Sequence, residues 1–226
     1  EWMRMASNRF WIIRGLLASI GICSILTFSV IGPITVLILF LTFLSICIFG
    51  KLTNSSYKLS SFGFIYISIA TLSILWFRES SQGLISLSII ISTIMVTDVS
   101  AYIVGNWLGG PKLFKVISPN KTLSGFIGAA IFGVGWFYLT VSFFIQKYEI
   151  SYLPIGILIV ITSIFGDLFI SFLKRRVGIK DTGFILPGHG GLLDRADSIL
   201  PVFIIIPIIV IIFDLIKDPS LIILGW

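Results

Sequence analysis

The sequence is poor in charge, histidine and cysteine, and each shortage excludes a class of protein. Only 12% of the 226 residues are charged, roughly half the share of an ordinary globular domain, which excludes most soluble folds. The single histidine excludes a multi-histidine metal centre. Cys23 and Cys47 lie within apolar runs, so we expect packing residues rather than a disulfide or a metal site. The 8 prolines and 21 glycines are too few for a collagenous or disordered chain.

Apolar residues dominate instead. They make up 57% of the chain, the mean hydropathy is +1.09, and a helix needs about 20 mostly apolar residues to cross a bilayer. We therefore expect an all-α polytopic membrane protein with about seven transmembrane helices. The first stretch is too long for a cleaved signal peptide, and the opening Glu1–Trp2 pair is given no structural role. The predicted spans are 10–28, 33–50, 62–77, 84–105, 123–145, 152–173 and 199–217.

The basic residues predict the orientation of these spans. With seven spans, 13 of the 16 Lys and Arg residues fall on one side of the membrane. Basic residues concentrate on the cytoplasmic side, so we expect a cytoplasmic N-terminus and an external C-terminus. The three exceptions are Arg78, Lys147 and Lys217.

Four aspartates lie where carboxylates are costly. Asp98 and Asp167 fall near the cytoplasmic ends of the fourth and sixth predicted spans, while Asp194 and Asp197 lead into the seventh. Ionisable groups in a span need a partner, water or a metal. One interpretation is ion pairing with basic residues; the other is a site for a hard cation, because clustered carboxylates without His or Cys suit Mg²⁺. The basic residues considered for pairing are Lys174, Arg175 and Arg195.

Helical spacing gathers small or polar residues on one face of the fourth span and of the sixth span. Small residues on such a face let another helix or a ligand approach closely. In the fourth span the face carries Asp98, Ala101, Tyr102, Gly105 and Gly109. In the sixth, residues at i, i+4 and i+7 align a carboxylate, a hydroxyl and an ammonium, which belong to Asp167, Ser171 and Lys174.

Two polar loops complete the pattern. In loop 111–122, Ser118-Pro119-Asn120 predicts a turn and a helix cap. Lys121 and Thr122 then lie at a helix N-terminus, which favours anion binding. Loop 171–198 alternates basic groups, glycines and acidic groups, a combination that suits a metal-bound nucleotide polyphosphate.

This second loop resembles the CDP-diacylglycerol synthase (phosphatidate cytidylyltransferase) family. It matches the pattern S-x-x-K-R-x4-K-D-x5-P-G-H-G-G-x2-D-R-x-D over residues 171–197. A second similar region runs from Asp98-x-x-Ala101-Tyr102-x-x-Gly105 to Ile117-Ser118-Pro119-x-Lys121-Thr122. The resemblance spans about residues 84–200. It departs at Ser124, where many members carry Glu, and we assign that position no catalytic role.

The resemblance implies that CTP and phosphatidic acid react to give CDP-diacylglycerol and pyrophosphate with a divalent cation, Mg²⁺, a second cation being left open. It implies a catalytic domain over 84–226, with about four spans and loops 106–122 and 174–198, preceded by about three spans over 1–83. The expected metal ligands are Asp167 and Asp194, with Asp98 and Asp197. The expected catalytic groups also include Lys174, Arg175, Lys180, Asp181, His189 and Arg195. The expected substrate contacts are Ser118, Lys121, Thr122, Ser171, Gly190, Gly191 and Tyr102.

Other functions stay open at this point. An archaeol-type cytidylyltransferase or a polyprenol kinase would also use CTP and a lipid, and an ion or solute carrier would use the intramembrane carboxylates differently. We expect the lipid bilayer as a partner, no nucleic acid, and a location in the bacterial inner membrane with the active site on the cytoplasmic face. Small-residue faces permit a helix-packed homodimer without requiring one.

Overall fold

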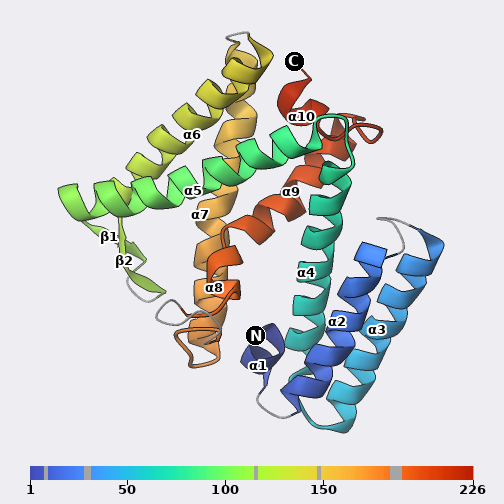
Figure 1. Ribbon diagram of the computed structural model, residues 1–226. Helices are drawn as coiled ribbons and strands as arrows, with labels where there is room; N and C mark the ends of the chain where they lie inside the picture. The colour runs from blue at the N-terminus through green and yellow to red at the C-terminus, as the bar shows by residue number, and fades with distance from the viewer. Residues whose placement is uncertain (8–9, 28–31, 115–116, 147–148, 184–189, 226) are drawn as a thin grey trace. The chain divides into compact units, whose positions relative to one another are not determined.

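The structure is a computed structural model of residues 1–226, and it describes all of them except 8–9, 28–31, 115–116, 147–148, 184–189 and 226 (Figure 1). The chain divides into two compact units, each built from two segments. Unit 1 comprises Glu1–Leu75 and Leu173–Ala196, and unit 2 comprises Trp76–Phe172 and Asp197–Trp226. The predicted division after residue 83 stays a prediction.

An apolar helix overlaps each predicted span, which confirms the class of an all-α polytopic membrane protein. Within the described residues, five helices are long and apolar enough to cross a membrane, while α2 and α9 are shorter. The count of seven spans therefore stays a prediction. The apolar helices are α2 (Trp11–Thr27), α3 (Pro33–Leu52), α4 (Tyr57–Arg78), α5 (Gly83–Leu108), α6 (Leu123–Ile145), α7 (Leu153–Arg176, after the short 3-10 turn η1, Ile150–Tyr152) and α9 (Ile199–Ile212).

Two helices differ from the predicted spans by five residues at one end. Helix α4 begins five residues before the predicted start at 62 and includes the polar residues Ser60 and Ser61, which are buried. The Ser60 hydroxyl donates a hydrogen bond to the Ser56 carbonyl, so its polar group is satisfied within the helix. Helix α9 ends at Ile212 rather than at 217, and Asp214 beyond it has a left-handed backbone with φ of 55°. Such a conformation ends a helix.

In unit 1 the opening residues form helix α1 (Trp2–Ala6), contrary to the expectation that Glu1–Trp2 has no structural role. Trp2 is buried, and its Nε1 donates to the Leu59 carbonyl at 2.8 Å. Buried Arg14 of α2 donates to Ser60 of α4 and to the carbonyl of Met3. These bonds hold α1, α2 and α4 together.

In unit 2, helices α5 and α6 pack along each other (Figure 1). Their approach requires Gly125, since a Cβ there would lie 2.6 Å from the Ala101 carbonyl oxygen. Ala101 and Gly105 of the face predicted on the fourth span therefore pack against α6, whereas Tyr102 on the same face is exposed. Helix α7 packs against α6 through a cluster of Ala129, Val160, Ile164 and Leu168, which Ala101 of α5 also contacts.

A small hairpin joins α5 to α6. Strand β1 (Lys112–Phe114) pairs antiparallel with β2 (Ser118–Thr122), with Lys112 opposite Thr122 and Phe114 opposite Ser118. The prediction of a turn at Ser118-Pro119-Asn120 is wrong, because these residues lie in β2. In a two-stranded sheet both strands are edges, and an edge strand accommodates a proline.

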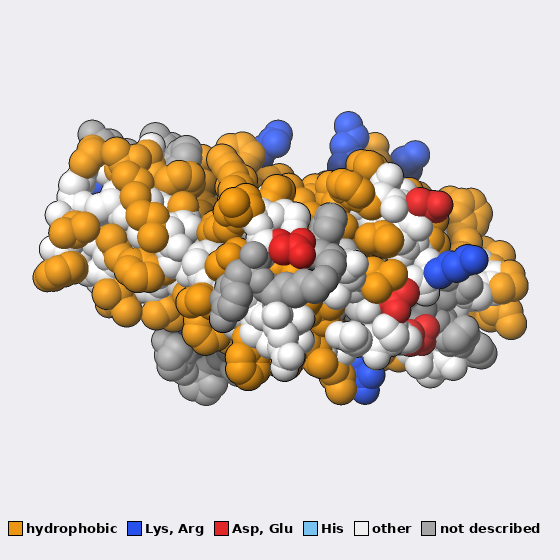
Figure 2. Space-filling model, turned by 90° about the horizontal axis from the view of Figure 1, so that it is seen from above, with side chains coloured by type: hydrophobic (Ala, Val, Ile, Leu, Met, Phe, Trp, Pro, Cys, Tyr) orange, Lys and Arg blue, Asp and Glu red, His pale blue; other side chains and the backbone are white. Residues whose placement is uncertain are grey.

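The surface agrees with a lipid environment. Hydrophobic side chains cover most of the face shown in Figure 2, with few charged groups among them. Exposed Ile, Leu and Phe side chains recur along α3, α5 and α6. Exposed apolar surface on this scale is typical of membrane contact.

Candidate functional site

The first group of polar side chains lies in unit 2 and is called here the carboxylate cluster: Asp98, Lys121, Asp167, Ser171 and Ser198. Lys121 Nζ of β2 lies 2.7 Å from Asp167 Oδ2 of α7. The Ser171 hydroxyl donates to Asp167 Oδ1 at 3.2 Å. Asp98 of α5 interacts electrostatically with Asp167 and Lys121, and the Ser198 hydroxyl lies within its hydrogen-bonding reach. Four segments distant in sequence therefore meet at two carboxylates.

Local structure explains how these segments are positioned. Thr122 is the N-cap of α6, and its hydroxyl accepts the Gly125 N–H at 3.2 Å. This cap holds Lys121 directly before the helix. On α7, a Cβ at Gly166 would lie 2.1 Å from Pro201 Cγ, so glycine allows the start of α9 to lie against α7 at the residue before Asp167. Buried Asp197 accepts the Ser198 N–H at 2.9 Å, which orients Ser198 beside Asp98.

The second group lies in unit 1 and is called here the loop cluster: Lys174, Asp181, Thr182, Gly190, Gly191 and Asp194. Lys174 Nζ donates to Asp194 Oδ1 at 2.9 Å. Asp194 Oδ2 accepts the N–H groups of Thr182 and Gly191, both at 2.9 Å. Partial burial raises the pKa of Asp194, but these hydrogen bonds outweigh it, and the pKa lies below the usual aspartate value. Asp194 is thus an ionised group that organises the loop.

Glycine is required where this loop folds over Asp194. Gly190 has a φ of 81°, in the region that favours glycine, and a Cβ there would lie 3.0 Å from Asp194 Oδ2 and 3.7 Å from Asp181 Oδ1. A Cβ at Gly191 would lie 2.4 Å from Thr182 Oγ1. The Gly190-Gly191 pair therefore lets backbone and carboxylates approach closely.

One participant has no signal in the sequence. Glu1 accepts the N–H groups of Leu192 and Leu193 at 2.9 and 2.7 Å, at the start of helix α8 (Leu193–Ala196). A single glutamate at the far end of the sequence gives no indication of this contact. The division between the two units falls at the end of α8, so that Asp194 belongs to unit 1 and Asp197 to unit 2.

The remaining predicted site residues are distributed as follows. Arg175, Lys180, Asp181 and Arg195 are exposed, and Tyr102 of α5 is 72% exposed. Ser118 is half-buried in β2. His189 lies outside the described residues.

The ion pairs concern the two interpretations of the four aspartates, which are pairing with basic residues and binding of a hard cation. Lys174–Asp194 is one of the pairs considered from the sequence, whereas Lys121–Asp167 is not. Among the described residues, no three His, Cys, Asp or Glu side chains are placed to hold one metal ion. Asp98 and Asp167 with neighbouring hydroxyls nevertheless offer an all-oxygen donor set, which fits Mg²⁺. A metal role for Asp194 and Asp197 stays a prediction.

Comparison with known proteins finds a matching family and several similar relatives. The model of a family described as the cytidylyltransferase family matches residues 1–213. A phosphatidate cytidylyltransferase of Staphylococcus aureus (strain COL) is 32% identical over 221 residues, which cover 93% of this chain and 84% of the relative. One of Staphylococcus haemolyticus (strain JCSC1435) is 36% identical over 166 residues, covering 71% and 63%.

Proposed function

The chain belongs to the cytidylyltransferase family, and from this premise we propose that it transfers the cytidylyl group of CTP to phosphatidic acid. The products are CDP-diacylglycerol and pyrophosphate. The observation that carries the proposal is the similarity to phosphatidate cytidylyltransferases over 93% of the chain. The apolar helices support it, because they give the protein access to a lipid substrate.

The reaction needs charge neutralisation more than a strong base. A phosphate oxygen of phosphatidic acid bonds to the α-phosphorus of CTP, and the bond from that phosphorus to the bridging oxygen breaks, releasing pyrophosphate. The lipid phosphate is already ionised near pH 7, so no proton has to be removed. Both substrates are anions, and positioned cations stabilise the charge that shifts to the leaving group. We assign this role to Lys121, Lys174, Arg175, Lys180 and Arg195.

The carboxylate cluster suits the cation that accompanies CTP. We propose that Asp98 and Asp167 hold Mg²⁺; the metal-binding roles expected for Asp194 and Asp197 stay predictions. When bound, the ion would draw negative charge from the phosphate oxygens. Lys121 pairs with Asp167 at 2.7 Å, and we expect it to contact substrate phosphate when a cation neutralises that carboxylate. Ser118, Thr122, Ser171, Tyr102 and the Gly190-Gly191 backbone are proposed as further substrate contacts, and His189 as a donor to the departing pyrophosphate.

The proposed location follows from the basic residues. We place the protein in the bacterial inner membrane, with both polar clusters on the cytoplasmic side, where CTP is available. A homodimer stays a prediction.

The proposal is tested by assaying purified protein in liposomes containing phosphatidic acid, with CTP and Mg²⁺. We expect CDP-diacylglycerol by mass spectrometry and an equal amount of pyrophosphate, both lost with EDTA. Asp167→Asn should lose at least about 100-fold in rate, because it removes a charged ligand. Asp214→Asn is the matched control, since Asp214 is exposed and Asn tolerates its left-handed backbone. Wild-type protein that inserts and folds but makes no CDP-diacylglycerol would overturn the proposal.

A further inference from the structure

The carboxylate of Glu1, the residue before helix α1, joins two sides of the loop cluster in unit 1. Its Oε1 accepts the Leu192 N–H at 2.9 Å, and its Oε2 accepts the Leu193 N–H at 2.7 Å. The Thr182 hydroxyl donates to Oε2 at 3.4 Å. Residues ten positions apart in the loop are therefore held by one side chain that comes from outside it.

Glu1 and Asp194 divide the hydrogen-bond donors of this loop between them. Asp194 Oδ2 accepts the N–H groups of Thr182 and Gly191, both at 2.9 Å. With the two backbone contacts of Glu1, three consecutive N–H groups from Gly191 onward are bound to carboxylates. Hydrogen bonds to a charged group are roughly twice as strong as those between neutral groups. The two carboxylates therefore fix the backbone on both sides of the loop.

Two glycines leave room for the Glu1 carboxylate. A Cβ at Gly183 would lie 2.5 Å from Glu1 Oε1, and one at Gly191 would lie 2.7 Å from Glu1 Oε2. The three atoms nearest to the Gly183 position all belong to the Glu1 side chain. The loop is thus packed around this carboxylate, and a methyl group at residue 183 would displace it.

Helix α1 fixes the position of Glu1. Trp2 is buried against α4, where a Cβ at Gly63 would lie 1.9 Å from Trp2 Nε1. After the last residue of α1, the Ser7 carbonyl accepts a hydrogen bond from the Arg14 guanidinium of α2 at 2.6 Å. Glu1 therefore extends to the loop from a helix that α2 and α4 hold in place.

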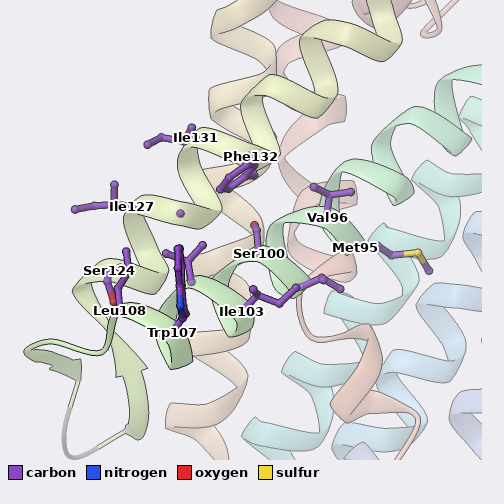
Figure 3. A pocket seen from close by; sticks show the side chains of 13 residues that line it. Met95, Val96, Ser100, Ile103, Trp107, Leu108, Ser124, Ile127, Ile131 and Phe132 are labelled. Carbon is purple, nitrogen blue, oxygen red and sulfur yellow. The ribbon is translucent and has the colours of Figure 1, made fainter.

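The apolar hollow along α5 and α6 in unit 2 has a different character, because the described residues that line it carry no charge. Figure 3 shows the Trp107 and Phe132 rings and the side chains of Ser100 and Ser124 in its lining. Such a surface does not orient a cation toward a phosphate. Support for the cations of the loop comes from the polar contacts within unit 1.

We propose that Glu1 is a positioning residue for cytidylyl transfer. The inference rests on the proposed function, in which Lys180 and Arg195 of this loop present their charges to substrate phosphate. Glu1 acts through the loop backbone, and holds in one arrangement the segments that carry these two cations. A misplacement of about 1 Å at a reacting group can cost about 100-fold in rate, so loss of this contact should be visible in turnover.

Glu1→Gln tests the proposal kinetically. The variant keeps the size of the side chain but has one accepting oxygen in place of two, so the contacts to Leu192 and Leu193 cannot both be kept in their present geometry. We expect kcat to fall at least about tenfold. KM for phosphatidic acid and for CTP should change less than about twofold, because the cations act on charge that develops in the transition state. Glu79→Gln is the matched control, since Glu79 is exposed after the end of α4 and should leave kcat unchanged.

A double-mutant cycle tests the contact itself. Gly183→Ala alone should lower kcat about tenfold, because its methyl group displaces the Glu1 carboxylate. In Glu1→Ala protein the three contacting atoms are gone, and the same change at residue 183 should alter kcat less than about twofold. Losses that multiply in the double variant would show that the two residues act independently, and would overturn the proposal.

Hydrogen exchange separates positioning from a general effect on folding. Peptides covering 190–196 should exchange about tenfold faster in Glu1→Gln, because charge-assisted hydrogen bonds are lost there, while peptides from α2 and α4 keep wild-type rates. Faster exchange throughout unit 1, with kcat per folded molecule unchanged, would show a merely structural role and overturn the proposal.

The same measurement distinguishes this proposal from the proposed function. Equal exchange of 190–196 in wild type and Glu1→Gln would overturn the role of Glu1 even if wild-type turnover is normal. Wild-type protein that shows Glu1-dependent protection but makes no CDP-diacylglycerol would support the hold of Glu1 on the loop and contradict cytidylyl transfer.

Discussion

At the residue scale, Lys121 connects the two roles that the sequence suggests for the polar residues, which are phosphate binding and metal binding. It was expected to contact phosphate, and in the structure it neutralises Asp167 at 2.7 Å. Both side chains stay partly accessible, at 28% and 30%, so the ion pair is open to exchange with a cation and an anionic substrate. The contact joins residues 46 positions apart, a pairing that local sequence cannot reveal.

We predict that Lys121→Met reduces kcat/KM by about 100-fold, the usual effect of removing one group that stabilises transition-state charge. Its effect on the free energy of unfolding should stay within about 1 kcal/mol, because an ion pair that solvent partly reaches is screened and contributes little. Lys112→Met on the neighbouring strand is the control, since Lys112 is exposed and should change neither quantity. Steady-state kinetics and denaturant unfolding check this. A variant that loses stability and activity together would show that Lys121 is structural.

Asp194 gives a prediction about pH. Its pKa is lowered in the folded loop, so the ionised carboxylate stabilises the loop above about pH 4, and this stabilisation is lost as the pH falls below the usual aspartate pKa toward the lowered one. Hydrogen exchange of peptides covering 180–196, corrected for intrinsic rates, should show protection at pH 5–7 that falls below about pH 4. Asp194→Asn should lack this protection at every pH, because an amide cannot accept both backbone N–H groups and the Lys174 ammonium. Full protection of that variant at pH 7 would contradict the assignment.

At the element scale, the predictions succeed where one chain segment determines its own structure. Helix α6 occupies the predicted residues 123–145 because Thr122 caps a long apolar run. The hairpin was not predicted, because Ser-Pro-Asn is typical of turns. These residues form a strand only because they pair with Lys112–Phe114, and local sequence does not reveal such a partner. The packing role of Gly105 was one of two alternatives from the sequence, and only the position of α6, whose Gly125 lies against it, decides between them.

Close packing of α5 and α6 can be tested with two glycines on the same helix. Gly125→Ala should destabilise the protein by about 1–3 kcal/mol, because its Cβ would lie 2.6 Å from a backbone oxygen of α5. Gly135→Ala is the control, since a Cβ there meets nothing within 4 Å. Alanine favours helix over glycine by up to about 1 kcal/mol, so this variant should be neutral or more stable. Unfolding in mixed detergent micelles measures both, and equal stability of the two variants would contradict the packing account.

At the scale of the whole molecule, the distribution of Lys and Arg predicts that the polar clusters face the cytoplasm. The sequence predicts the positions of the apolar helices well, because hydropathy is summed over many residues. The orientation rests on the Lys/Arg bias and stays a prediction. It predicts which residues are candidates for the site, but not that Lys121 meets Asp167 or that Glu1 binds the start of α8. Those contacts depend on tertiary packing.

Orientation can be measured with single cysteines in a chain whose Cys23 and Cys47 have been replaced. Lys112→Cys and Glu149→Cys lie at exposed positions at opposite ends of α6. In intact bacterial cells, an impermeant thiol reagent should label the cysteine at 149, and should reach the one at 112 only after permeabilisation. The reverse pattern would place the carboxylate cluster outside the cell and contradict the proposed access to CTP.

The central claim is that the α-phosphorus of CTP is the atom transferred, and its most direct test is the position of the label in the product. Purified protein is incubated with phosphatidic acid, Mg²⁺ and CTP that carries radioactive phosphorus at either the α or the γ position. Cytidylyl transfer predicts that the α label enters the lipid and the γ label leaves as pyrophosphate. Transfer of the γ label to lipid would show a kinase, and no transfer of either label by folded wild-type protein would contradict the account.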